Sequence, residues 1–420
     1  MSIIKKIKEM SLEMTRWRHR LHAEPELAFE ERKTARFISR QLQMFRMDDV
    51  QSLAKTGVVG VLHGKSGPGG PAIMLRADMD ALPIQEKTGV LHQSREPGVH
   101  HACGHDGHMA MLLGAAKYLA ETRNFEGTVY FVFQPAEEHI GGAQEMIKQG
   151  LFSKFPAEAI YGLHNFPDLP LGTMATGAGP MLAANDDFHV TFKGIGGHSA
   201  RAGNTTDVIA AAAEAILAIK AMAKAEIAAD EPAAVTVCGL FTDGEANNVI
   251  PDSISFNGSI RTFDTALHDR LKEKMQKIVE DTAQKHGVTL ELDFENGYPV
   301  LVNSSDETDF AISVAKETVG DNAVITNVPR TLGVEDFAFY LEKKPGNFMA
   351  IGTGPTDGSK GPDIHSAKYD FNDAALPVGA SYWARLVEKA LPIGGRPPNS
   401  NIGGKPAVNT NAPQNKPPAA

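Results

Sequence analysis

Side chains that bind metal ions crowd into one short segment of the sequence. Residues 100–111 read HHACGHDGHMAM and form a glycine-containing loop that leads into a predicted helix. The side chains of interest are His101, Cys103, His105, Asp106 and His108. Thiolate, imidazole and carboxylate groups are the ligands of zinc and its first-row neighbours. A lone histidine in a polar loop is more often structural than a ligand, but this density beside one of only two cysteines predicts a metal site.

An adjacent pair of glutamates forms the second group. The segment QPAEE places Glu137 and Glu138 directly after the apolar run 129–133, which we interpret as a strand. Such a pair is most often a solvated surface pair. At the carboxyl end of a strand in an open α/β sheet, however, ligands bind. Because adjacent side chains there point in different directions, one carboxylate can bind metal while the other acts as a general base.

Two more histidines and two aspartates occupy similar positions. His164 follows the apolar run 160–163, and His365 lies in a glycine-containing loop after the run 348–352. Each histidine alone is more often structural, but together they favour one site at the strand ends. Asp78 and Asp80 follow a further predicted strand in the segment LRADMDALP. Carboxylates there can orient a ligating imidazole from behind, and ordinary turn chemistry is an equal alternative.

The elements that must position these residues alternate between helix and strand. This alternation over 1–184 and again over 298–391 predicts one discontinuous α/β domain with helices on both faces of its sheet. Residues 185–297 instead show the order β-α-β-β-α-β, which predicts an inserted ferredoxin-like domain. Residues 392–420 are rich in Pro, Gly and Asn and are expected to be disordered.

The inserted region carries three more candidate residues. His198 lies in GIGGHSARAGN, Asn248 lies in NNVIPD, and Arg261 ends a predicted strand. Such residues from a second domain can polarise a carbonyl group and pair with a carboxylate. Each is weak alone, because histidine and asparagine are common in glycine-rich loops.

Composition excludes several classes of protein. The chain has 420 residues and a net charge of −10 without a basic block, which argues against nucleic-acid binding. Two cysteines exclude a disulfide scaffold, and we interpret Cys238 as a packing residue of an apolar strand. Neither a signal peptide nor a membrane span is predicted, so the expected location is the cytoplasm.

The ordered motifs resemble a known family. They are RHRLHAEPELAFEE, RADMDALPIQE, HACGHDGHMAMLLGAA, FQPAEE, GLHN, GGHSA, NVIPD, GVEDFAFYLEKKPGNF, IHS and SAKYDFND, and they span residues 18–373. The sequence is similar to dinuclear metal-dependent amidohydrolases, which include hippurate hydrolases, N-acyl-amino-acid deacylases and auxin–amino-acid conjugate hydrolases. This resemblance implies an aminopeptidase-like catalytic domain, with a mixed sheet between helices, and an inserted lid or dimerisation domain.

The resemblance also implies residue roles. Two divalent ions (Zn, Mn, Co or Ni) are expected per subunit. The implied metal ligands are Cys103, His105, Glu138, His164 and His365, with Cys103 bridging the ions. Glu137 matches the general base, and His198 matches a residue that stabilises the oxyanion. Asn248 and Arg261 match substrate-binding positions, and Asp78 and Asp80 are expected behind the ligands.

The implied reaction is hydrolysis of the amide bond of N-acyl amino acids. Two alternatives remain: a carboxypeptidase or dipeptidase acting on short peptides, and a metal- or ligand-binding protein without turnover. The segment 200–207 departs from the Pro-His and Ile/Val-Asp-Pro pattern of many members. This departure bears on the substrate pocket and on domain or subunit contacts. The sequence leaves the oligomeric state open; an edge strand of the inserted domain can pair between subunits and so form a homo-oligomer.

Overall fold

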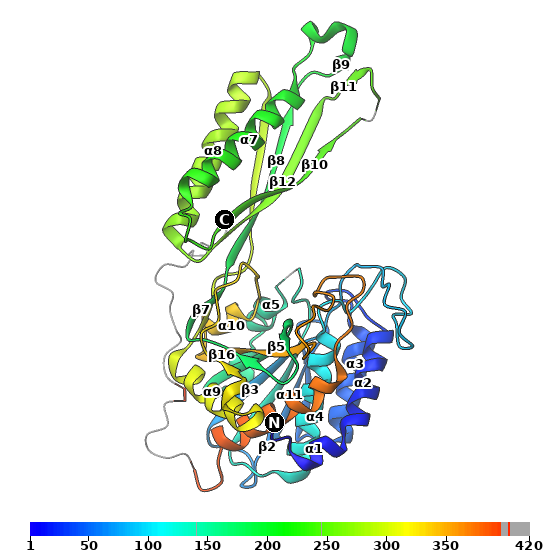
Figure 1. Cartoon of the computed structure of the whole chain (residues 1–420), viewed down its shortest axis with the longest axis vertical. Helices are drawn as coiled ribbons and strands as arrows, with labels where there is room; N and C mark the ends of the chain where they lie inside the picture. The colour runs from blue at the N-terminus through cyan, green and yellow to red at the C-terminus, as the bar shows by residue number, and fades with distance from the viewer. Residues whose placement is uncertain (140, 245, 396–401, 404–420) are drawn as a thin grey trace. The chain divides into compact units, whose positions relative to one another are not determined.

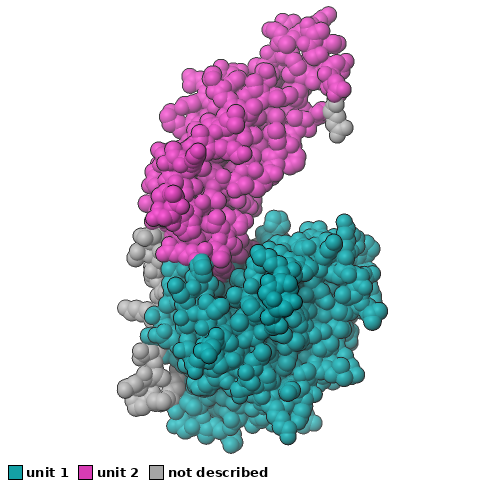
Figure 2. Space-filling view, in the orientation of Figure 1, with its two compact units in different colours: residues 1–181, 302–329, 335–408 teal, residues 182–301, 330–334, 409–420 magenta. Residues whose placement is uncertain are grey.

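The structure is a computed structural model that describes residues 1–139, 141–244, 246–395 and 402–403. The described residues form two compact units (Figure 2). Unit 1 consists of Met1–Met181, Val302–Pro329 and the described residues from Glu335 onward, and unit 2 of Leu182–Leu301 and Arg330–Val334. Most of the tail predicted at 392–420 lies outside the described residues.

Unit 1 is built on a mixed eight-stranded sheet (Figure 1). The strands, in spatial order, are β1 (Asp49–Leu53), β2 (Gly57–His63), β4 (Thr128–Gln134), β3 (Ala72–Asp78), β5 (Ala159–Pro170), β16 (Gly346–Gly354), β6 (Met174–Ala175) and β15 (Val324–Ile325). Strand β3 pairs in parallel with β4 and β5, and β5 pairs in parallel with β16. The carboxyl ends of these four strands therefore meet at one edge of the sheet.

Helices and the apolar faces of the strands form the core of unit 1. One cluster joins Ile73, Leu75 and Ala77 of β3 to six helices. These are α1 (Lys5–Glu9), α2 (Ser11–Ala23), α3 (Arg32–Met44), α4 (His105–Thr122), α9 (Ser305–Val319) and α11 (Leu376–Ala390). Residues Met74 and Arg76, which alternate with them, are also buried but lie outside this cluster. This alternation is what a strand covered on both faces requires.

The remaining elements of unit 1 are short. They are α5 (Gly142–Lys148), α6 (Leu151–Lys154), α10 (Ala338–Leu341) and the 3-10 turns η2 (Asp321–Ala323) and η3 (Asp373–Ala375). The strands β7 (Gly179–Leu182) and β14 (Leu301–Asn303) each contain one residue of unit 2. Helix α10 packs against α5. Glu335 and Asp336, just before α10, accept hydrogen bonds from the buried side chains of Arg76 and Gln134.

Unit 2 has the predicted β-α-β-β-α-β order. Its antiparallel sheet has the spatial order β10 (Ala234–Thr242), β12 (Ser253–Thr262), β8 (Ala184–Lys193) and β13 (Thr289–Asn296). Helices α7 (Val208–Glu226) and α8 (Thr265–His286) share one apolar core with this sheet. Asp207 caps α7 by accepting a hydrogen bond from the Ala210 N–H at 2.9 Å, and Asp264 caps α8 in the same way. The predicted fold class is confirmed.

One interpretation of the sequence is wrong. Cys238 is exposed, not packed, because it alternates along β10 with Val235 and Val237, which pack against the apolar core of unit 2. Its side chain therefore lies on the opposite face of the sheet. None of the helices in the described part of the chain is long and apolar enough to cross a membrane.

Candidate metal centre

The loop before α4 brings its ligands to the strand ends. His105 is the first residue of α4, and Gly104 before it has a φ of +90°. A Cβ atom at Gly104 would lie 2.2 Å from Oδ1 of Asn165, so only glycine fits there. The loop thus passes directly against Asn165 in the middle of β5, and it holds Cys103 and His105 beside His164 of the same strand.

All five ligands implied by the resemblance lie together. The Sγ atom of Cys103 is 3.4 Å from Nε2 of His164. The Glu138 carboxylate lies between two imidazoles: Oε1 is 3.8 Å from Nε2 of His105, and Oε2 is 3.4 Å from Nε2 of His365. Donor atoms of Cys103, Glu138 and His365 all lie within 4.8 Å of one another. Residues far apart in the sequence therefore form one cluster of metal-type donors.

The hydrogen bonds of the buried His105 and His164 use Nδ1 and leave Nε2 of each ring available to bind a cation. The Nδ1–H of His105 donates to the Asp80 carbonyl at 2.9 Å, and that of His164 donates to the Asn165 carbonyl at 2.8 Å. Each Nε2 then carries a lone pair that points into the cluster. Nε2 of His105 and Oε1 of Glu138 are buried acceptors without a hydrogen-bond partner. Buried acceptors that face one another are costly unless a cation lies between them.

The electrostatics of the cluster also call for positive charge. Burial, followed by Glu138 and Glu137, raises the pKa of the Cys103 thiol well above its usual value. Burial opposes protonation of His105, but Asp78 and other carboxylates outweigh it and raise the His105 pKa to about 10. A divalent cation reverses both effects, because it stabilises a thiolate and a neutral imidazole as ligands. The donor set fits a metal centre.

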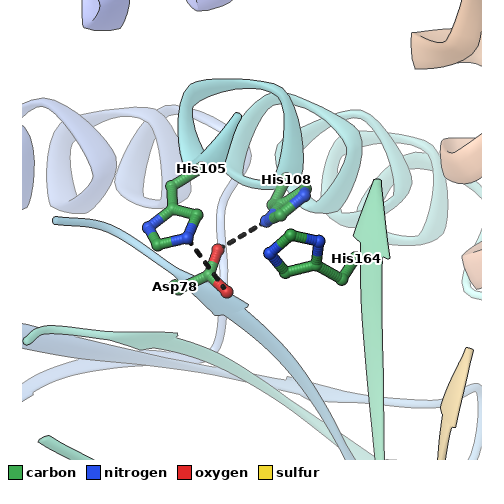
Figure 3. Close-up of side chains that lie close together, drawn as sticks. All are labelled: Asp78, His105, His108 and His164. Carbon is green, nitrogen blue, oxygen red and sulfur yellow. Dashed lines mark hydrogen bonds and ion pairs between the residues drawn. The ribbon is translucent and has the colours of Figure 1, made fainter. Parts of the chain in front are cut away.

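The two aspartates behind the cluster have different partners. The Asp80 carboxylate accepts hydrogen bonds from the N–H groups of Glu137 and Glu138, each at 3.0 Å. Asp80 therefore fixes the backbone of both glutamates and, through its carbonyl, also the ring of His105. Asp78 instead lies 2.6 Å from Nδ1 of His108 and 3.8 Å from Nε2 of His105 (Figure 3).

His108, although it lies beside the cluster, has both ring nitrogens occupied. Nδ1 contacts Asp78, and Nε2 lies 2.6 Å from Oδ1 of Asn165. The other carboxylate oxygen of Asp78 accepts a hydrogen bond from Arg76 at 2.6 Å. Asp78 and His108 therefore support the cluster, and one donor atom each from Asp78, His105, His108 and His164 lies within 4.8 Å of the others.

Glu137 differs from its neighbour in its surroundings. Its side chain is buried, and Oε2 lies 3.9 Å from Nε2 of His105. Burial, followed by the charges of Glu335 and Glu138, raises the pKa of Glu137 well above its usual value. A carboxyl group with a raised pKa can both accept and return a proton near neutral pH.

Sequence reasoning missed two groups that support the glutamates. Arg76 is fully buried and pairs with Glu335 at 2.9 Å, Asp336 at 3.1 Å and Asp78. Glu31 accepts a hydrogen bond from the N–H of Ala136 at 2.9 Å. A signal existed for the first group: Arg76 is a charged residue inside an apolar run, and GVED supplies two adjacent carboxylates.

The three candidate residues of unit 2 do not form one group. His198 pairs with Val249 between β9 (Gly197–His198) and β11 (Val249–Ile250), and the Ser199 N–H donates to the Asn248 carbonyl at 2.9 Å. Arg261 lies near the far end of β12, about 25 Å along the strand from Ser253. Its guanidinium donates to the Leu332 carbonyl at 2.8 Å. His198 and Asn248 therefore lie together, and Arg261 lies apart from them.

Comparison with known proteins gives the family. The peptidase family M20/M25/M40 matches residues 74–389. The chain is 37% identical over 391 residues to hippurate hydrolase of Campylobacter jejuni, which covers 93% of this chain and 100% of that protein. It is 36% identical over 375 residues to N-acetylcysteine deacetylase of Bacillus subtilis, with 88% and 94% coverage. It is 37% identical over 382 residues to an IAA-amino acid hydrolase of Arabidopsis thaliana, with 90% and 85% coverage.

The fold comparison agrees. A solved structure from Bacillus subtilis, described as a dinuclear metal binding peptidase of the M20 family, superposes with a TM-score of 0.75 at 33% identity. The superposition covers 91% of this chain and 99% of that chain. This chain belongs to peptidase family M20/M25/M40 and is a metal-dependent amidohydrolase. The predicted family and enzyme class are confirmed.

Proposed function

We propose that this enzyme hydrolyses the amide bond of N-acyl amino acids and releases a carboxylic acid and a free amino acid. The observation that carries the proposal is the pair of neighbouring glutamates at the end of β4, one beside a cluster of metal-type donors and the other buried among carboxylates. Three relatives are named for hippurate, N-acetylcysteine and IAA-amino acids. Each of these compounds is an acyl group joined to an amino acid.

We propose that two divalent ions bind at the cluster, held by Cys103, His105, Glu138, His164 and His365. Cys103 is the proposed bridging ligand. Such ions supply Lewis acidity, which activates water and polarises a carbonyl group. A donor set of thiolate, imidazole and carboxylate suits Zn, Co, Ni or Mn, and availability often decides among them.

Glu137 is the proposed general base. Its carboxylate takes a proton from the attacking water and later delivers that proton to the leaving amine nitrogen. The Asp80 carboxylate holds the Glu137 N–H, so the side chain starts from a fixed backbone position. Proton transfer by a positioned side chain typically contributes about 10²–10⁴-fold to the rate.

Unit 2 is proposed to contribute His198 to oxyanion stabilisation and Asn248 and Arg261 to substrate binding. The separation of Arg261 from the other two residues weighs against one common binding role within unit 2.

Edge strand β10 is the proposed surface for homo-oligomer formation, because Leu240 and Phe241 on it are 55% and 59% exposed. The mass in solution of the wild type and of Phe241→Lys tests this: a smaller species only in the variant is expected, and equal masses contradict it.

A substrate panel tests the proposed reaction. The metal-depleted enzyme is reloaded with Zn, Mn, Co or Ni, and each form is assayed with N-benzoyl-glycine, N-acetyl amino acids and dipeptides. We expect the highest kcat/KM on the N-acyl amino acids and loss of activity on chelation. A clear preference for dipeptides with a free amino group would instead identify a dipeptidase. Metal binding without turnover on any substrate would identify a binding protein.

A further inference from the structure

A second group of metal-type side chains lies in unit 1, apart from the five proposed ligands. It consists of His22 on α2, Glu86 in the loop after β3, and His100 before α4. One donor atom from each residue lies within 4.8 Å of the others. The exposed fractions of these residues are 0% for His22, 8% for Glu86 and 0% for His100. None of them belongs to the cluster that the reaction uses.

The donor atoms of this group face one another. Nε2 of His22 is 3.2 Å from Oε1 of Glu86, and Nε2 of His100 is 3.9 Å from the same oxygen. The Nδ1–H of His22 donates to the Asp106 carboxylate at 2.8 Å. A carboxylate behind an imidazole is the usual arrangement for a metal-binding histidine, because it fixes the ring and raises its basicity.

His100 is the residue that calls for a further ligand. Although it is fully buried, neither of its ring nitrogens makes a hydrogen bond of normal geometry. Burial lowers the pKa of His100, with smaller opposing contributions from Glu86 and from the Tyr369 backbone. The ring is therefore neutral and carries a free lone pair. A buried lone pair costs free energy unless it is satisfied.

Protonation of His22 offers a competing account of part of the group. Burial opposes the charge, but Asp106 outweighs it and raises the pKa of His22 to about 9. A protonated His22 donates to both Asp106 and Glu86 and satisfies all three groups. It leaves His100 unexplained. A cation in place of that proton would satisfy His22, Glu86 and His100 together.

We propose that His22, Glu86 and His100 bind a third divalent cation of the zinc type. Two imidazoles and one carboxylate form a donor set that zinc and its neighbours accept. Binding exchanges the Nε2 proton of His22 for the cation and releases that proton to solvent. The ion would tie α2 to the loop before α4, and so would support the segment that carries Cys103 and His105.

Cobalt titration of the full-length chain tests the proposal. Sulfur-to-cobalt charge-transfer absorption requires a cysteine ligand. With Cys238→Ala present in every chain compared, it arises only from ions that Cys103 binds, so the third ion should bind without adding to it. We expect three equivalents per wild-type chain and two per His100→Leu chain, by elemental analysis after dialysis. The charge-transfer band should be the same in both. His19→Gln, on the same helix, is the control and should retain three equivalents.

Two further variants separate this site from the catalytic one. Glu86→Gln should also lose one equivalent, and circular dichroism checks that it remains folded. Cys103→Ala should lose the charge-transfer band but keep an ion that the additional change His100→Leu removes. Equal metal content in the wild type, His100→Leu and Glu86→Gln would overturn the proposal and leave His22 as a buried imidazolium.

Discussion

At the residue scale, side chains of similar type take different surroundings at the metal centre. Glu138 lies between His105 and His365, whereas Glu137 is buried beside other carboxylates. Asp80 accepts hydrogen bonds from the N–H groups of both glutamates, so their backbones are held alike. The difference in their surroundings therefore arises from the direction of each side chain. This geometry is why adjacent residues of the same type are proposed to serve as ligand and base.

The cysteines allow a matched comparison. Cys103→Ala should lose bound metal, because it removes the proposed bridging thiolate, and activity should fall with it. Cys238→Ala should retain both, because Cys238 is exposed on β10. Elemental analysis of the two purified variants measures the difference. Full metal occupancy in Cys103→Ala would contradict the ligand assignment.

The ligand types, and aspartates behind them, could be predicted from the sequence, but Glu31 could not. Cys103, His105 and Glu138 belong to residue types that bind metals, and they follow predicted strands or precede a predicted helix. Glu31 acts by accepting a hydrogen bond from the Ala136 backbone N–H. Any carboxylate can do this, so the role depends on a tertiary contact that no local pattern reveals.

At the element scale, the turn after β4 is held in an unusual conformation. Ala136 has a φ of +55°, which a residue with a Cβ rarely adopts. Glu31 accepts hydrogen bonds from the Ala136 N–H and from the Thr56 hydroxyl. These bonds compensate the strain and fix the residue that directly precedes Glu137.

Glu31 should make stability depend on pH. Burial outweighs its hydrogen bonds and raises its pKa from 4.5 to about 7. Because the folded pKa is raised, the contribution of Glu31 to stability is complete below pH 4.5 and is lost as the pH rises through 7. Glu31→Gln cannot ionise, so its melting temperature should increase relative to that of the wild type over this range. A difference in melting temperature that does not change with pH would contradict this.

The buried Arg76 should be essential for stability. Arg76→Met would leave Asp78, Glu335 and Asp336 without their cation, which typically costs about 3–5 kcal/mol. We expect the melting temperature to fall by roughly 10 °C. Arg123→Met is the control, because its ion pair with Asp48 is partly exposed and should cost at most about 1 kcal/mol. Equal shifts in the two variants would rule out a special role for the buried network.

At the scale of the whole molecule, unit 2 contains a chain segment that the helix and strand periodicity of the sequence does not indicate. The sequence predicted an insertion at 185–297, and the described unit 2 consists of Leu182–Leu301 together with Arg330–Val334. The second segment joins through contacts such as that between Arg261 and the Leu332 carbonyl. A five-residue stretch without regular structure carries no periodic signal, so its assignment required the folded chain.

Closure of unit 2 on substrate is a prediction at this scale. Lid closure in enzymes excludes water and completes the catalytic group. We expect an N-acyl amino acid analogue that resists hydrolysis to reduce the radius of gyration measured by solution scattering. His198→Ala should lower kcat without changing metal content. An unchanged scattering profile, together with normal turnover in His198→Ala, would contradict a catalytic role for unit 2.

The central claim is that Glu137 is the general base and Glu138 a metal ligand. The most direct test makes the same Glu→Gln substitution at each of these adjacent positions. Glu137→Gln should keep the metal content of the wild type and lose at least about 10²-fold in kcat on N-acyl amino acids, because it removes the proton acceptor. Glu138→Gln should lose bound metal, because it weakens a ligand. Metal content and kcat are measured on the same preparations. Near-normal turnover in Glu137→Gln, or full metal content in Glu138→Gln, would contradict the proposed division of roles.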